Sequence, residues 1–157
     1  MPPGTVGNRR LELYVRSLSG EASAGSDHAR QVRELDRTGC VDAGRVIVWG
    51  EQVGLTTTAF RTRVGKCIID RVAAFRAWAH ERGATMTPFF ETRTVTGKIT
   101  GESYTAVRLP VVCLAEYDGD DLIHVAPYRS GDADCTVGER LQYLRDRTAT
   151  RRKVATT

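Results

Sequence analysis

A single long amphipathic stretch, residues 59–82, constrains the fold more than any other part of this chain. Its apolar residues recur every three or four positions, a period that predicts an α-helix with one buried stripe. The stripe consists of Phe60, Val64, Cys67, Ile68, Val72, Phe75, Trp78 and Ala79. Thr57 or Thr58 can cap its start, and Gly83 can end it in the left-handed conformation. A helix of this length can cross a small domain, so we expect a sheet to pack against it.

Arg71 interrupts the apolar stripe, because it falls between Val64, Phe75 and Trp78 on a helical wheel. A buried arginine needs a carboxylate or several carbonyl groups to satisfy its five donors. Two interpretations stay open. Arg71 either reaches solvent from the edge of the stripe, or it forms a buried ion pair or an anion site.

The rest of the chain alternates between strand-like and helix-like patterns. Strands are expected at 11–18, 45–49, 85–96, 103–117 and 122–128, and further helices at 28–37 and after the capping box at 136–139. Within the fourth strand, Pro110 indicates an edge or a bulge. The order β-α-β-α-β-β-β-α permits a parallel crossover between the first two strands. We predict an α+β domain over residues 10–147, with one mixed sheet of about five strands packed against the long central helix.

In this arrangement we expect the helices largely on one face of the sheet. The other face would carry Tyr14, Arg16, Arg45, Ile47 and Trp49. Aromatic side chains interleaved with arginine can stack bases on an open sheet. Alternatively, the last helix or a second copy of the protein covers this face, because Ile47 and Trp49 are costly to expose.

All of the excess positive charge lies at the C-terminal end. Residues 1–144 carry 18 basic and 18 acidic side chains, whereas residues 145–157 carry five basic residues and one acidic residue. A short basic segment can bind phosphate, and it can equally be a solvated end. We expect disorder at residues 1–9 and a basic disordered tail at 148–157. The candidate nucleic-acid-binding residues are Arg30, Arg33, Arg37, Arg61, Arg63, Lys66, Arg151, Arg152 and Lys153. The alternative for the helical arginines is a solvated face balanced by neighbouring acidic residues.

No catalytic or cofactor-binding motif occurs in the sequence: it has no P-loop, dinucleotide fingerprint, GxSxG or HExxH. We therefore expect a protein that is not an enzyme and that needs no cofactor. The four cysteines, Cys40, Cys67, Cys113 and Cys135, form no metal-ligand spacing, and the aspartates near residues 118–121 and 132–134 fit turns better than a cation site. Because the chain contains neither a long apolar run nor the apolar core of a signal peptide, we expect a cytoplasmic protein without membrane contact.

Several segments together resemble a known family. They are LELYVRSL, VIVWGEQV, IIDRVAAFRAWAHERG, PFFETRTVTGKITGESYTAVRLPVVCLAEYDGDDLIHVAPY and TVGERLQYL, in this order. Over roughly residues 10–145 the chain resembles short haloarchaeal proteins described as helix-turn-helix domain proteins. The resemblance implies a DNA-associated, transcriptional-regulator-like role with duplex DNA as the partner. A protein-interaction or small-ligand-sensing module without nucleic-acid binding stays open as the alternative.

The spacing of the helices bears on this resemblance. A helix-turn-helix requires a turn of three or four residues, but the expected strand at 45–49 separates the two expected helices. The alternative is a winged variant, with 28–37 as the reader helix and the following strand in the wing. A homodimer is a further expectation.

Overall fold

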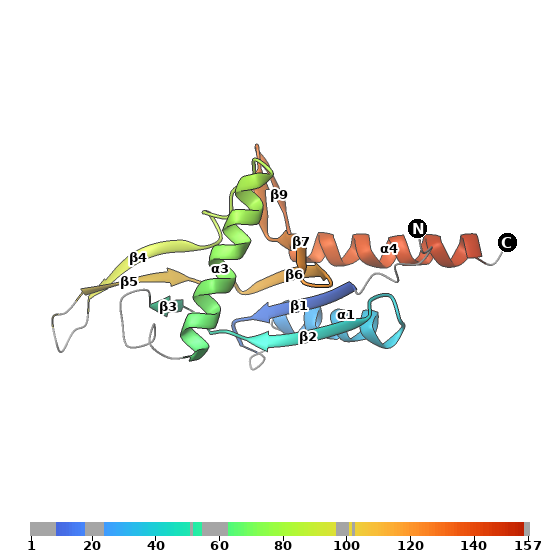
Figure 1. Cartoon of the computed structure of the whole chain (residues 1–157), viewed down its shortest axis with the longest axis horizontal. Helices are drawn as coiled ribbons and strands as arrows, with labels where there is room; N and C mark the ends of the chain where they lie inside the picture. Colours follow the sequence, from blue (N-terminus) through green and yellow to red (C-terminus); the bar gives the residue numbers. More distant parts are fainter. Residues whose placement is uncertain are drawn as a thin grey trace.

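The computed structural model describes residues 9–17, 24–50, 52–54, 63–96, 101 and 103–155. Its helices are α1 (Ala24–Arg37), α3 (Arg63–Glu81) and α4 (Val137–Ala155). Its strands are β1 (Arg9–Val15), β2 (Ala43–Val48), β3 (Gln52–Gly54), β4 (Glu91–Thr96), β5 (Ser103–Arg108), β6 (Val112–Asp118), β7 (Asp121–Ala126), β8 (Tyr128–Ser130) and β9 (Ala133–Cys135). The predicted α+β class is confirmed (Figure 1).

The centre of the fold is a four-stranded mixed sheet in the order β2-β1-β6-β7. β1 pairs with β2 in parallel and with β6 antiparallel, and β6 pairs with β7 antiparallel. The parallel pairing of β1 and β2 through α1 confirms the crossover that the strand-helix-strand order permits. Gly119, in the left-handed conformation with φ 62°, closes the tight turn between β6 and β7.

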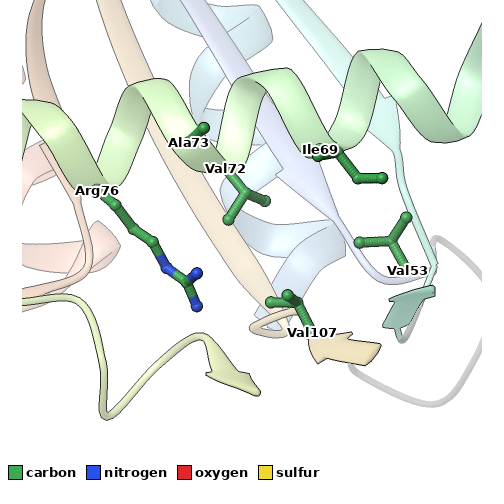
Figure 2. A pocket seen from close by; sticks show the side chains of 6 residues that line it. All are labelled: Val53, Ile69, Val72, Ala73, Arg76 and Val107. Carbon is green, nitrogen blue, oxygen red and sulfur yellow. The ribbon is translucent and has the colours of Figure 1, made fainter. Parts of the chain in front are cut away.

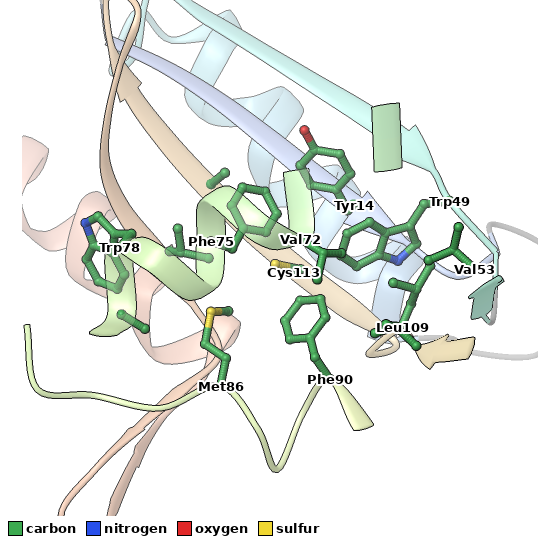
Figure 3. Close-up of a cluster of buried hydrophobic side chains, with 14 of the residues drawn as sticks. Tyr14, Trp49, Val53, Val72, Phe75, Trp78, Met86, Phe90, Leu109 and Cys113 are labelled. Carbon is green, nitrogen blue, oxygen red and sulfur yellow. The ribbon is translucent and has the colours of Figure 1, made fainter. Parts of the chain in front are cut away.

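Both faces of this sheet are covered by helices. Along β1, Leu11, Leu13 and Val15 pack with residues of α1 and α4, whereas Tyr14 packs with residues of α3 (Figure 3). The expectation that helices lie largely on one face is therefore wrong. Alternating side chains of a strand point to opposite faces, and here the polar-looking face of β1 is as buried as the aliphatic one.

α3 is the central helix that the apolar stripe predicts. Val72, Phe75, Trp78 and Ala79 are buried, but Cys67 is exposed. The helix ends as predicted, with Gly83 at φ 70°. Residues 59–62, including Phe60, lie outside the described part of the chain. In Figure 1 α3 crosses the strands of the molecule, and it contacts β3 and β7.

The strand predicted at residues 103–117 is two strands in two different sheets. β5 belongs to a three-stranded antiparallel sheet in the order β3-β5-β4, and β6 belongs to the four-stranded sheet. The break falls at residues 109–111, where Pro110 has no amide hydrogen to donate to a ladder. The prediction of a single sheet is thus wrong, and the proline marks the place where it divides.

Two other predicted boundaries differ from the structure. Residues 85–90 are not a strand: the backbone turns there, with the Phe90 amide donating to the Met86 carbonyl at 2.9 Å, and β4 begins at Glu91. Met86 and Phe90 are both buried, so this turn supplies part of the core beneath α3. The short strands β3, β8 and β9 have three residues each and offered no periodic signal.

The ends of the chain are more regular than predicted. Arg9, expected to be disordered, begins β1. At the other end α4 continues to Ala155, past residue 148 where a disordered basic tail was expected. The helix begins at the predicted capping box, with the Glu139 amide donating to the Thr136 hydroxyl at 3.1 Å. Five of residues 148–155 are alanine, arginine or lysine, which favour the helical conformation and account for the longer helix.

Candidate nucleic-acid interface

The three arginines predicted on the first helix share one exposed face of α1. Arg30, Arg33 and Arg37 are all exposed, on the side of the helix away from buried Ala29, Val32 and Leu35. Arg30 pairs with Asp27 at 2.8 Å, and Arg37 pairs with Glu34 at 3.5 Å. The exposed charges of α1, three arginines and three acidic residues, therefore balance.

The basic residues predicted near the start of the long helix are only partly described. Arg61 lies outside the described residues, and Arg63 begins α3 with its side chain outside the described part. Lys66 is exposed on α3. Because α3 and α1 cover opposite faces of the four-stranded sheet, the structure does not bring these residues together with the arginines of α1.

Arg151, Arg152 and Lys153 lie on the last turns of α4. Among the side chains described for this helix, Leu144 is the last buried one, and Arg145, Asp146 and Arg147 after it are exposed. α1 and α4 pack side by side, and in Figure 1 both run toward the same end of the molecule, where α4 extends beyond the sheet. The structure therefore brings the C-terminal ends of two candidate helices to one end.

An ion pair that the sequence analysis missed joins α4 to the sheet, beside the apolar contacts of the helix. Glu116 on β6 is fully buried, and Arg140 on α4 donates two hydrogen bonds to it, at 2.5 and 3.0 Å. Burial alone would lower the pKa of Arg140, but the bonds to Glu116 and its charge outweigh this and raise it. Arg9 lies 3.8 Å from the same carboxylate. A glutamate within an otherwise apolar strand was the available signal, because buried carboxylates require partners.

Arg71 forms the ion pair that one interpretation of the sequence anticipated, although it is partly exposed. Its guanidinium lies 3.8 Å from the carboxylate of Glu12 and donates to the Tyr117 hydroxyl at 2.9 Å. The Tyr14 hydroxyl donates to Glu12 at 2.9 Å. Burial and the charge of Glu12 raise the pKa of Tyr14, which keeps this hydroxyl protonated. The cluster is satisfied internally and offers no vacant anion site.

The sheet face considered for base stacking is part of the core. Tyr14 and Trp49 are 3% and 4% exposed, and their ring centroids lie 4.8 Å apart beneath α3 (Figure 3). The base-stacking hypothesis is therefore wrong, because neither ring can reach a nucleotide. The cover is α3, not the last helix or a second copy.

We also searched the described part of the chain for a metal site and for a membrane-spanning helix. Among those residues no group of three His, Cys, Asp or Glu side chains could hold a metal ion. The aspartates near the turns include Asp134, which is paired with Arg129 at 2.6 Å. None of the helices described is long and apolar enough to span a membrane.

Comparison with protein families identifies the family of this chain. A family model described as a helix-turn-helix domain matches residues 4–149. The chain belongs to this helix-turn-helix domain family. Comparisons with curated proteins and with solved structures gave no match.

The described helices do not themselves form a two-helix motif with a short turn. Between α1 and α3 lie β2 and β3, and residues 55–62, just before α3, lie outside the described part. β2 is a parallel strand of the central sheet, so the predicted wing formed by the strand after 28–37 is wrong. The antiparallel hairpin that directly follows a helix is β4–β5, after α3.

Proposed function

We propose that this protein is a non-enzymatic, DNA-associated protein of the transcriptional-regulator type, with duplex DNA as its partner. The observation that carries the proposal is the basic half of α4. Residues 145–157 hold five basic residues and one acidic residue, and in Figure 1 this part of the helix extends beyond the sheet. Membership of a helix-turn-helix domain family supports the same role.

The two candidate helices would contribute differently to binding. The arginines of α1 are balanced by acidic neighbours, so α1 creates little long-range field toward a phosphate backbone. The basic half of α4 has four charges in excess and supplies that field. We propose that α4 contacts phosphates and that the exposed face of α1 contacts base edges, because phosphate contacts position a protein and base contacts give specificity.

The salt dependence of binding tests the role of α4. Each phosphate contact contributes about 0.9 to the slope of log affinity against log salt concentration. Replacing Arg151, Arg152 and Lys153 with alanine should flatten the slope by roughly two to three units if all three contact DNA. Replacing the exposed Arg93 and Arg108 of the three-stranded sheet is the control for charge removal, and it should leave the slope unchanged.

The role of α1 requires a separate readout. Replacing Arg30, Arg33 and Arg37 with alanine should reduce discrimination between DNA sequences more than it changes the salt slope. Selection from a pool of random duplexes, with the intact protein and with the variant, measures this discrimination. If the intact protein binds no duplex in such a pool at low salt, the proposed function is wrong.

Three features named from the sequence stay predictions of this proposal: a cytoplasmic location, an archaeal source and a homodimer. A homodimer would present two copies of the basic end to one duplex and would favour a two-fold symmetric target. Sedimentation equilibrium across a range of protein concentrations measures the association directly.

A further inference from the structure

A small pocket lies between α3 and the three-stranded sheet (Figure 2). Its volume is about 190 Å³. The lining residues are Val53 of β3, Ile69, Val72, Ala73 and Arg76 of α3, and Val107 of β5. Five of the six side chains are aliphatic, so the pocket is an apolar space with one charged side chain.

Arg76 differs from the other partly buried arginines of α3 and α4. Its guanidinium donates to the Phe90 carbonyl at 2.7 Å and lies 3.5 Å from the Thr92 hydroxyl, and no carboxylate of the described residues pairs with it. Arg71 and Arg140, by contrast, each pair with a buried glutamate. Burial lowers the pKa of Arg76, which indicates a cation whose lost hydration is not offset by a counter-ion.

We propose that this pocket binds a small hydrophobic carboxylate. The apolar body would lie between Val72, Val107 and Ile69, and the carboxylate would accept hydrogen bonds from Arg76. Figure 2 shows the Arg76 side chain extending from α3 alongside Val72 toward the sheet, with its guanidinium at one side of the aliphatic group. The backbone carbonyl of Phe90 fixes one guanidinium nitrogen, which leaves other donors of the planar fork for a ligand.

The size of the pocket limits the ligand. A cavity of about 150 Å³ lined by aliphatic and aromatic side chains accommodates a benzene ring, whereas pockets for drug-sized ligands begin at about 300 Å³. At about 190 Å³ the pocket can hold one six-membered ring or a short alkyl chain with a carboxylate, and it is too small to enclose a nucleotide or a long-chain fatty acid.

Methyl NMR with benzoate as the probe tests the proposal. The lining offers methyl groups of Val53, Ile69, Val72 and Val107, and a bound ring would shift these resonances through its ring current. Benzyl alcohol, which is similar in size but uncharged, is the matched probe for the role of the carboxylate, and hexanoate tests whether a chain replaces the ring. We expect saturable shifts at the four residues with benzoate and weaker binding of benzyl alcohol.

Two variants and a control assign the binding to this pocket. Ala73 is exposed at the pocket, so Ala73→Phe should fill the space and abolish benzoate binding without removing core atoms. Arg76→Gln should weaken benzoate binding at least about tenfold, as expected for loss of a charge-assisted hydrogen bond, and should leave benzyl alcohol unaffected. Ala74→Phe, on an exposed position of α3 outside the lining, should bind benzoate as the original protein does.

Three results would overturn the proposal. These are an absence of saturable shifts at the pocket methyls with either carboxylate, equal binding of benzoate and benzyl alcohol, or unchanged benzoate binding in Ala73→Phe. Each variant is compared only when its spectrum in the absence of ligand shows the native fold. The pocket uses no residue of α1 or α4, so this proposal and DNA binding can each fail without the other.

Discussion

The two faces of the four-stranded sheet each bury one glutamate, and they satisfy it in different ways. Glu116, on the face covered by α4, accepts two hydrogen bonds from the Arg140 guanidinium. Glu12, on the face covered by α3, accepts from the Tyr14 hydroxyl, while Arg71 stays 3.8 Å away and also binds Tyr117. The Arg140 side chain is 18% exposed and that of Arg71 is 37% exposed.

This difference shows how burial decides the role of an ion pair. Glu116 depends mainly on one arginine in a dry environment, so the pair fixes the position of α4. The charge of Glu12 interacts with a hydroxyl and with a more distant arginine that is partly exposed. A partly hydrated arginine contributes less to the stability of the fold, because solvent screens its interaction with the carboxylate.

The largest expected loss comes from the apolar packing of α3, the helix that covers the Glu12 face of the sheet. Trp78 of α3 is 6% exposed and contacts the rings of His124 and Tyr128, with centroids 5.1 and 5.6 Å away. Trp78→Ala should lower the free energy of unfolding by about 3–5 kcal/mol. Urea denaturation measures this change. A loss below about 1 kcal/mol would contradict the assignment of α3 as the core helix.

Removal of Arg140 should have the next largest effect. Arg140→Met leaves a fully buried carboxylate with Arg9, 3.8 Å away, as its remaining ion-pair partner among the described residues, and we expect a loss of about 3 kcal/mol, the lower end of the range for a broken buried pair. The double variant Glu116→Leu with Arg140→Met should recover most of this loss, since a well-packed apolar pair can replace a buried ion pair.

The exposed pair on α1 is the matched control for that comparison. Arg30 and Asp27 lie 2.8 Å apart, a distance within the range of the Arg140–Glu116 bonds, but both side chains are largely solvated. Arg30→Met should cost no more than about 0.5 kcal/mol. Equal losses in Arg30→Met and Arg140→Met would show that distance, rather than burial, sets the strength of these pairs.

Arg71→Met tests the other buried glutamate. The Tyr14 hydroxyl still donates to Glu12 in this variant, so we expect a loss of about 1–2 kcal/mol, smaller than for Arg140→Met. Chemical denaturation of both variants under identical conditions provides the comparison. A loss as large as that of Arg140→Met would mean that the two faces do not differ in the way the contacts indicate.

The smallest effect expected near the two glutamates is a pH dependence of stability that arises from His124, which lies near Glu116. Burial and the charge of Arg140 lower the pKa of His124 from 6.5 to about 4, although Glu116 acts in the opposite direction. The folded protein therefore keeps His124 neutral where the unfolded chain binds a proton, and stability decreases as the pH falls from about 6.5 toward 4.

Because the His124 ring is partly exposed, we expect it to account for roughly 1 kcal/mol of the loss between pH 7 and pH 5. Denaturation of the original protein and of His124→Gln at both pH values isolates this contribution from that of the carboxylates. The same loss in both proteins would show that His124 does not titrate differently on unfolding.

Local patterns predicted the parts of the fold that depend on neighbouring residues. The spacing of Val72, Phe75 and Trp78 predicted the central helix, and Thr136 with Glu139 predicted the start of α4. The alternation of Leu11, Leu13 and Val15 predicted a strand with a buried face. These features follow from helix and strand periodicity and from the hydrogen-bonding capacity of individual side chains.

Long-range features could not be predicted in the same way. Glu12 and Tyr14 give β1 an apparently polar face, and only their contact with α3 shows that this face is buried. Arg140 and Glu116 are 24 residues apart, with no local pattern that connects them. Of the candidate binding residues, the sequence identified the arginines of α1 as one face and offered a balance by acidic neighbours as the alternative, and the contacts identify Asp27 and Glu34 as partners.

The break at Pro110 separates two sheets for which we expect different local stability. β4 is an edge strand that pairs only with β5, and residues 91–94 and 96 are exposed. Its amide protons can exchange with deuterium through local opening, whereas those of β1, which is paired on both sides and buried on both faces, exchange only in larger unfolding events. The pocket lies where α3 meets the more labile sheet, so a bound ligand would slow amide exchange in β5 without altering that of β1.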